Sequence, residues 1–253
     1  MTDDLALAER AALAAGEVLM SYFGRAADGL DMKSSPTDPV SDADREAEHT
    51  IRELLLGERA DDGLVGEEGS RETPGNGRTW IVDPLDGTVN FLYGMRNWAV
   101  SIALEDAEGL AAGVVFNPVD AECFSATRGG GAVINGRRIH VTSCPSLDRA
   151  MVATGFSYEA DQRASQAQLL TRLLPRVRDI RRAGAAALDL AYVACGRVDA
   201  FYERGLKRWD EAAGRLLVEE AGGSCVWMDE GWPGLLAASH EALAEELRAF
   251  VEP

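Results

Sequence analysis

The spacing of hydrophobic residues predicts two helices at the start of the chain. Between residues 3 and 23, apolar side chains recur every three or four positions, which is typical of a helix with one buried face. Ser41 is a candidate N-cap for a second helix, whose inner face would carry Ala47, Ile51, Leu54 and Leu55. We therefore expect two amphipathic helices before the first strand.

Strand patterns dominate the next part of the chain. Short strands are predicted at residues 64–65 and 79–82. The second should stop at Asp83, because Pro84 fixes its own φ and has no backbone N–H to donate. Residues 97–140 contain successive strand patterns with a hairpin signal at Asn135-Gly136, which predicts an antiparallel sheet.

From about residue 146 the pattern changes to an alternation of strands and helices, which favours an α/β arrangement. The predicted strands are 151–154, 179–181, 198–201 and 224–227, and the predicted helices are 160–174, 184–196, 208–221 and 239–250. We expect a layered sandwich of mixed α+β and α/β character. Its N-terminal subdomain, residues 1–145, would hold the antiparallel sheet, and residues 146–253 would form the α/β subdomain.

Composition and charge narrow the possible functions. The 253 residues are 46% hydrophobic and 26% charged, as in globular proteins. No apolar run reaches membrane-spanning length, the acidic start lacks a secretory signal, and four scattered cysteines are typical of reduced thiols. We thus predict a cytoplasmic protein without a membrane partner. The net charge of −17 disfavours nucleic acid, and a phosphate-bearing ligand would need local cations.

Candidate chemistry is concentrated in Asp83-Pro-Leu-Asp86-Gly87-Thr88, which follows a hydrophobic strand. Two carboxylates this close are suitable ligands for Mg²⁺, and Gly87 and Thr88 could offer N–H groups to an anion. Asp and Gly are also common in ordinary turns, so the segment alone leaves both interpretations open.

Two further acidic motifs are ambiguous when taken singly. Gly66-Glu67-Glu68-Gly69 follows a short strand and could be a solvated loop. In Trp209-Asp210, the aspartate stands where a helix is predicted to begin, a position that the helix dipole favours for any acid.

Taken in order along the chain, these motifs resemble the signatures of the inositol monophosphatase family, a group of metal-dependent phosphomonoesterases. Residues 33–44 resemble the family's first active-site loop, and residues 182–189 resemble the segment beside the substrate. Tyr202-Glu203 and Trp209-Asp210 resemble its last conserved block. The resemblance covers nearly the whole chain and implies the family's layered fold.

The resemblance implies two or three Mg²⁺ ions per active site. Glu67, Asp83 and the Leu85 carbonyl would bind the first ion. Asp83, Asp86 and Asp210 would bind the second, and a weaker third ion would lie near Glu67.

The resemblance also implies a catalytic set and a substrate-binding set. The catalytic set is Thr88, Asp44 and Glu67, in which Thr88 and Asp44 would orient the attacking water. Glu203 would accept hydrogen bonds from sugar hydroxyls. The implied substrate contacts are Asp86, Gly87, Thr88, Gly184, Ala185, Ala186, Glu203 and Asp210, and Lys33 and Glu68 accompany the metal ligands. Ala185 departs from the family pattern, where serine or threonine is usual.

The function that the resemblance implies is Mg²⁺-dependent hydrolysis of inositol 1-phosphate to inositol and phosphate by a metal-activated water. Histidinol phosphate, fructose 1,6-bisphosphate and a nucleotide 3′-phosphate remain alternative substrates. A bisphosphate would need a second group of cations, for which the arginine-rich interval 163–182 is the candidate, although solvated helix faces and salt bridges explain that interval better. A non-catalytic, partner-binding member is a further alternative, and family membership implies a homodimer.

Overall fold

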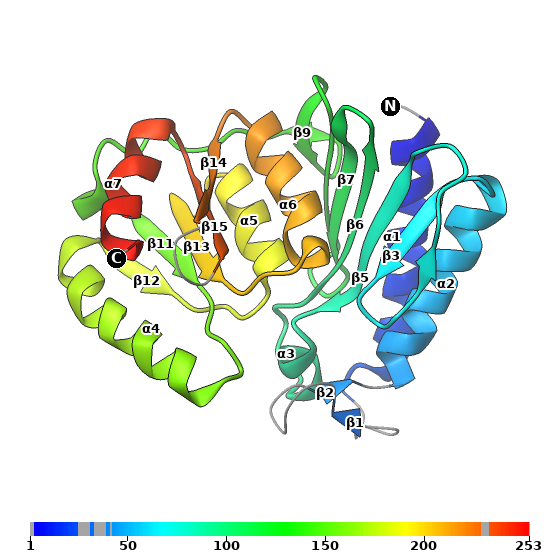
Figure 1. The fold of residues 1–253 in the computed structure, drawn as a ribbon, viewed down its shortest axis with the longest axis horizontal. Coiled ribbons are helices and arrows are strands. Elements are labelled where there is room, and N and C mark those ends of the chain that lie inside the picture. Colours follow the sequence, from blue (N-terminus) through cyan, green and yellow to red (C-terminus); the bar gives the residue numbers. More distant parts are fainter. Residues whose placement is uncertain (1–2, 25–30, 33–38, 41, 229–232, 253) are drawn as a thin grey trace.

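The computed structural model describes residues 3–24, 31–32, 39–40, 42–228 and 233–252. They form five alternating layers of helix and sheet (Figure 1). Helices α1 and α2 cover the outer face of an eight-stranded sheet, and α5 and α6 lie between this sheet and a five-stranded sheet. Helix α7, with α4 beside it, covers the far side of the second sheet. The bounds are α1 (Asp3–Tyr22), α2 (Asp42–Glu58), α4 (Ala160–Leu173), α5 (Ala186–Ala194), α6 (Arg208–Glu220) and α7 (Glu241–Val251). The predicted layered sandwich is confirmed.

The first sheet has the strand order β10-β9-β8-β7-β6-β5-β3-β4. Every neighbouring pair is antiparallel except β3 and β5, which run parallel. The antiparallel sheet predicted for residues 97–140 is therefore present. The strands are β3 (Gly63–Gly66), β4 (Arg71–Glu72), β5 (Thr79–Asp86), β6 (Ala99–Asp106), β7 (Gly109–Asn117), β8 (Glu122–Thr127), β9 (Gly131–Ile134) and β10 (Arg137–Arg138).

The prediction that β5 stops at Asp83, before Pro84, is wrong, because the strand continues to Asp86. Asp83 pairs with Ser101 and Asp86 pairs with Ala99, so β5 has one more residue than β6 between these two pairs. The extra residue makes a β-bulge, where a proline without an N–H is tolerated. The bulge turns the end of β5 and carries both aspartates with it.

The second sheet has the order β12-β11-β13-β15-β14. Strands β12, β11 and β13 are parallel, whereas β15 is antiparallel to both β13 and β14. The sequence analysis missed β15 because its segment, Gly-Leu-Leu-Ala-Ala, lacks β-branched and aromatic residues. The strands are β11 (Met151–Thr154), β12 (Asp179–Arg181), β13 (Ala200–Arg204), β14 (Ser224–Met228) and β15 (Gly234–Ala238).

The small elements complete the fold. A two-stranded sheet precedes α2, a short helix follows β5, and two 3₁₀ helices flank the second sheet. They are β1 (Asp31–Met32), β2 (Pro39–Val40), α3 (Thr88–Leu92), η1 (Leu147–Arg149) and η2 (Leu174–Arg176). Among the described helices, none has both the length and the apolar character that crossing a bilayer requires.

Three separate apolar cores hold the layers together. One lies between α1, α2 and the first sheet and includes Leu7, Ile51 and Trp80. The second surrounds α5 and α6 and contacts both sheets, and the third lies under α7. Because the middle core joins the two sheets, the ends of their parallel strands are held at a fixed position relative to each other.

Candidate active site

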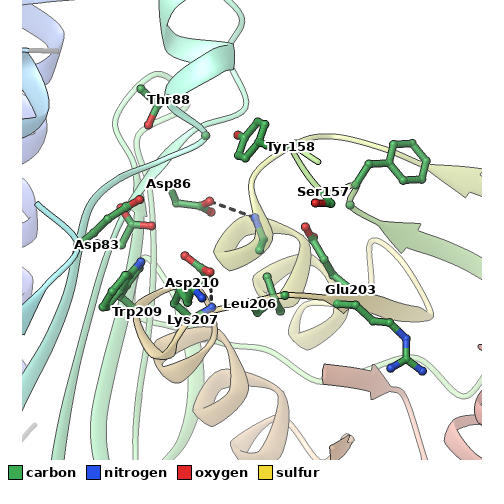
Figure 2. A pocket seen from close by; sticks show the side chains of 18 of the residues that line it. Asp83, Asp86, Thr88, Ser157, Tyr158, Glu203, Leu206, Lys207, Trp209 and Asp210 are labelled. Atoms are coloured by element: carbon green, nitrogen blue, oxygen red, sulfur yellow. Dashed lines mark hydrogen bonds between the residues drawn. The ribbon is translucent and has the colours of Figure 1, made fainter. Parts of the chain in front are cut away.

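A cavity of about 530 Å³ lies where the carboxyl ends of the parallel strands of both sheets meet. Ligand sites commonly form outside the carboxyl ends of parallel strands, because the loops that follow them gather at one edge. Figure 2 shows Asp83 and Asp86 on the first-sheet side, Asp210 at the start of α6, and Glu203 on the opposite side. The cavity therefore joins groups that lie far apart in the sequence.

Hydrogen bonds within the segment at the end of β5 fix the Asp83 side chain. The Leu85 N–H donates to Asp83 Oδ1 at 3.0 Å, and the Leu85 carbonyl accepts the Thr88 hydroxyl at 3.1 Å. The Thr88 hydroxyl also lies 3.3 Å from Asp44 Oδ1, and Asp44 is buried on α2. Thr88 and Asp44, predicted as a pair, are thus in contact.

Asp86 lies against the start of α5. Its Oδ1 accepts the Ala186 N–H at 3.2 Å and its Oδ2 accepts the Ala187 N–H at 2.8 Å. The first free amides of a helix favour a carboxylate at this position. Ala185 is buried and does not line the cavity, whereas Gly184 and Ala186 do.

Gly87 connects Asp86 to α3 in a conformation that requires glycine. Its φ is +90°, and a Cβ there would lie 2.9 Å from the Asn97 carbonyl oxygen and 3.2 Å from Ala185 Cβ. Asn90, on α3, donates its side-chain amide to the same Asn97 carbonyl at 2.6 Å and to Ala183 O at 2.8 Å. These contacts fix the segment before α5 against the first half of the chain.

Two further carboxylates come from β3 and α6. Glu67 follows β3, lines the cavity and hydrogen-bonds Asp83. Glu68 is half-buried beside it and lies outside the cavity lining. Asp210 lies in the first turn of α6, where its Oδ2 accepts the Lys207 N–H at 2.6 Å.

These carboxyl groups oppose one another's ionisation. Burial, with the nearby charge of Glu67, raises the pKa of Asp83 and of Asp210 well above the usual 3.8. Burial also raises the pKa of Asp86 to about 7, against the effect of the amide N–H groups that it accepts. Charged oxygens packed this closely in a dry site are costly unless a cation neutralises them.

The donor set suits Mg²⁺, which prefers a few hard carboxylate and carbonyl oxygens. Within the described ranges, no three acidic, histidine or cysteine side chains are placed so that together they could hold a metal ion. Asp86 and Asp210 are instead oriented by backbone amides. An ionised carboxylate has about four lone-pair sites, so each of these groups retains sites for a metal. The residues that supply such oxygen donors at the cavity are Glu67, Asp83, Asp86 and Asp210, with the Leu85 carbonyl.

The second-sheet side of the cavity has a different composition. The carboxyl group of Glu203, on β13, lies against Gly155. A Cβ atom added to Gly155 would lie 1.9 Å from Glu203 Oε2, so only glycine leaves space for this carboxyl group. Burial raises the pKa of Glu203 to about 8, while the charge of Arg182 acts to lower it. Arg182 lies over the Phe156 ring at 5.7 Å from its centroid.

Asp189, on α5, is a buried acid to which the sequence analysis gave no role. Neither oxygen of Asp189 has a hydrogen-bond partner among the described residues. Burial, then the charges of Glu203 and Asp86, raises the pKa of Asp189 well above 3.8. Asp189 therefore adds a buried carboxyl group, unpartnered among the described residues, close to Glu203.

Most of the predicted site residues meet in this cavity. Those that line it are Glu67, Asp83, Leu85, Asp86, Gly87, Thr88, Gly184, Ala186, Glu203 and Asp210. Asp44 lies behind Thr88, and Lys33 falls outside the described residues.

Several lining residues were not predicted: Gly155, Phe156, Ser157, Tyr158 and Lys207. Figure 2 shows Tyr158 over the same opening as Thr88 and Asp86. The sequence carried one usable signal for them, namely that residues after each of the parallel strands belong at the same edge.

Comparison with known proteins shows the family to which the chain belongs. The sequence model of the inositol monophosphatase family matches residues 1–252. An inositol-1-monophosphatase from Rhizobium meliloti is 43% identical, covering 96% of this chain and 94% of its own. A Nus factor SuhB from Xylella fastidiosa is 46% identical, covering 85% of this chain and 78% of its own.

Solved structures give the same result. The extragenic suppressor protein suhB from Bartonella henselae has a TM-score of 0.92 at 37% identity, covering 99% of both chains. An IMPase from Thermotoga maritima has a TM-score of 0.88 at 32% identity, covering 99% of this chain and 98% of its own. The sequence match and the shared fold agree, and the chain belongs to the inositol monophosphatase family.

Proposed function

We propose that this protein hydrolyses inositol 1-phosphate to inositol and phosphate in a Mg²⁺-dependent reaction. The observation that carries the proposal is the meeting of four carboxyl groups from three separate segments at one side of a cavity, with Glu203 on the other side. A phosphate monoester needs charge neutralisation and alignment more than covalent chemistry, and these carboxyl groups would supply both by holding Mg²⁺.

The first-sheet side would hold the metal ions. Glu67, Asp83 and the Leu85 carbonyl form one candidate ligand set, and Asp83, Asp86 and Asp210 form the other. Bound Mg²⁺ supplies an activated water and neutralises charge on the phosphoryl oxygens. The chain's own part is to orient these ligands through backbone amides and to align the attacking water through Thr88 and Asp44, which contact each other.

The second-sheet side would recognise the alcohol part of the substrate. The Glu203 carboxyl lies at the cavity wall and can hydrogen-bond the hydroxyl groups of a polyol. Gly155 leaves the space that this carboxyl occupies. We assign phosphate contacts to the segment from Gly184 to Ala186 only near its Gly184 end, since the Ala186 amide already donates to Asp86.

One alternative substrate class is favoured by a specific observation. Phe156, Tyr158 and Trp209 line the cavity, so a planar ring such as that of histidinol phosphate or a nucleotide could stack there. A bisphosphate has weaker support, because Arg182 is the sole member of the arginine-rich interval 163–182 in the cavity lining.

A non-catalytic role would explain a relative named Nus factor SuhB. Such a member would be expected to lose a metal ligand, whereas Glu67, Asp83, Asp86 and Asp210 are all present. We therefore rank catalysis first.

Phosphate release from a small panel tests the proposal. The panel is inositol 1-phosphate, histidinol phosphate, fructose 1,6-bisphosphate and adenosine 3′,5′-bisphosphate, each with Mg²⁺ and with EDTA. We expect Mg²⁺-dependent release with a preference for inositol 1-phosphate. A preference for a ring-bearing compound would change the substrate, and no release from any compound would favour the non-catalytic alternative.

Three other expectations stay predictions. The subdomain division at residues 145–146, the homodimer and the cytoplasmic location follow from sequence patterns and family resemblance alone. Light scattering after size-exclusion chromatography would test the dimer directly.

A further inference from the structure

Helix α2 buries a second acid one turn after Asp44. Glu48 is 4% exposed and faces the turn that carries Glu67. Its Oε2 accepts the Glu68 N–H at 2.8 Å, and its Oε1 accepts the Ser70 N–H at 3.0 Å. One side chain thus binds the turn at two points, with a different oxygen at each.

The turn leaves space for this carboxylate. A Cβ on Gly66 would lie 2.2 Å from Glu48 Oε2, closer than atoms can approach. Glycine at this position therefore allows the acid to reach the amides of the turn.

Every backbone N–H between Gly66 and Ser70 has an acceptor. Gly66 donates to Ser70 O at 2.9 Å, Glu67 donates to Val82 O at 3.1 Å, and Gly69 donates to Gly66 O at 3.4 Å. The other two amides depend on Glu48. Without its carboxylate, two N–H groups of the turn would lose their acceptor, and unpaired buried donors are costly.

We propose that Glu48 is a positioning residue for metal binding, which fixes the backbone that directly follows Glu67 and so aims the Glu67 carboxylate into the cavity. This inference rests on the proposed function of Glu67 as a metal ligand. Asp44 and Glu48 are four residues apart and share one face of α2. The helix would then orient two parts of the site at once, with Asp44 contacting Thr88 and Glu48 holding the Glu67 turn.

Glu48→Gln tests the proposal with little change of shape. The glutamine keeps one acceptor oxygen for one backbone N–H of the turn. Its NH₂ group would face the second backbone N–H, and two donors cannot form a hydrogen bond. Mn²⁺ binding is measured by electron paramagnetic resonance without substrate, and Mg²⁺ titration of phosphate release is measured alongside. Loss of a group that orients a metal ligand typically costs at least about tenfold in affinity, so we expect the Mn²⁺ Kd and the half-saturating Mg²⁺ to rise about tenfold. At saturating Mg²⁺, kcat should change far less.

Glu53→Gln is the matched control, because Glu53 is an exposed acid on the same helix. It should leave the Mn²⁺ Kd unchanged. An unchanged Kd in Glu48→Gln with a lowered unfolding temperature would show a merely structural role and overturn the proposal.

Gly66→Ala provides the second variant if Glu48→Gln does not fold. The added methyl group would displace the Glu48 carboxylate and should weaken Mn²⁺ binding in the same way. Folded Gly66→Ala protein with wild-type Mn²⁺ affinity would also contradict the proposal. If the wild-type protein binds Mn²⁺ but releases no phosphate, the proposed function fails. The Mn²⁺ Kd of Glu48→Gln relative to the wild type then still decides the role of Glu48.

Discussion

Each sheet forms one side of the cavity with the carboxyl ends of parallel strands, but the side chains on the two sides differ in their chemistry. In the first sheet, the parallel strands β3 and β5 lead to Glu67, Asp83 and Asp86. In the second, β11 and β13 are parallel and lead to Gly155 and Glu203. Each set of strand ends gathers side chains at one edge, but only the first gathers mainly like charges.

This difference separates two tasks. Carboxyl groups that raise one another's pKa destabilise the folded chain when they are ionised without a metal. The same concentration of negative charge favours the binding of a divalent cation. On the other side, Glu203 has an arginine nearby, a glycine beneath it and aromatic residues around it. Mixed groups of this kind recognise an organic substrate better than they hold a metal. Variants on the two sides should therefore affect different measurements.

The largest effect is expected from Asp83→Asn on the first-sheet side. The amide keeps the shape but removes a charge shared by both proposed metal sites, so phosphate release should fall on the order of a thousandfold. Because the charge is destabilising without metal, the unfolding temperature in EDTA should not fall. Exposed Asp161→Asn is the control. Substantial Mg²⁺-dependent turnover by Asp83→Asn would contradict the two-metal assignment.

Thr88→Val should give the next largest effect. The hydroxyl donates toward Leu85 O and Asp44 Oδ1, and valine keeps its volume. Loss of a group that aligns the attacking water should lower kcat about a hundredfold, with a small change in half-saturating Mg²⁺. Thr171→Val, at an exposed site on α4, serves as the control. If kcat is retained, the water-orienting role is wrong.

Gly155→Ala tests the second-sheet side without touching a carboxylate. The added methyl group would lie within about 2 Å of the Glu203 carboxyl and must displace it. One lost hydrogen bond to a carboxylate corresponds to roughly a tenfold rise in KM for inositol 1-phosphate. The half-saturating Mg²⁺ should stay unchanged, and KM for p-nitrophenyl phosphate should change less.

Gly57→Ala, where an added Cβ meets no other atom, is the control for that variant. A change in Mg²⁺ dependence without a change in KM would mean that the two sides of the cavity are not separable as described.

The smallest effect is a pH dependence of stability in the metal-free protein. The pKa values of Asp86, about 7, and Glu203, about 8, lie above the usual 3.8 and 4.5. Groups with raised pKa values stabilise the fold in their protonated form, and this contribution is lost as the pH rises through 7 and 8. Unfolding temperatures in EDTA should therefore rise as the pH is lowered from about 8 to about 6.

Two comparisons sharpen this experiment. Glu203→Gln should remove the part of the slope nearest pH 8, whereas Mg²⁺ should flatten the part that comes from Asp86. A melting temperature in EDTA that is independent of pH would contradict the description of both carboxyl groups as buried and uncompensated.

The sequence indicated the site more fully than it indicated the fold around it. The Asp83–Thr88 segment and Asp210 were recognisable because their order along the chain matches a family signature. Strand β15 was missed because leucine and alanine carry no strand preference. The end of β5 was misplaced because Pro84 is accommodated by a bulge, and a bulge depends on the partner strand.

The contacts of Glu48 could not be predicted from the sequence, although its burial could. Its position on the buried face of a predicted helix was visible in the sequence, since it follows Ala47 and precedes Ile51. Its partners, the amides of Glu68 and Ser70, lie about twenty residues away and belong to another element. No local pattern specifies such a contact.

The sequence by itself determined the family, the alternation of helices and strands, and the identity of the carboxylates, because these depend on residue type, spacing and order. Only the tertiary structure decided which groups share the cavity. Asp86 meets the amides of Ala186 and Ala187 across about a hundred residues, and Gly155 meets Glu203 across about fifty. Such meetings, and the pKa shifts that follow from burial, arise from the packing of layers, which brings distant strand ends to one edge and buries their side chains.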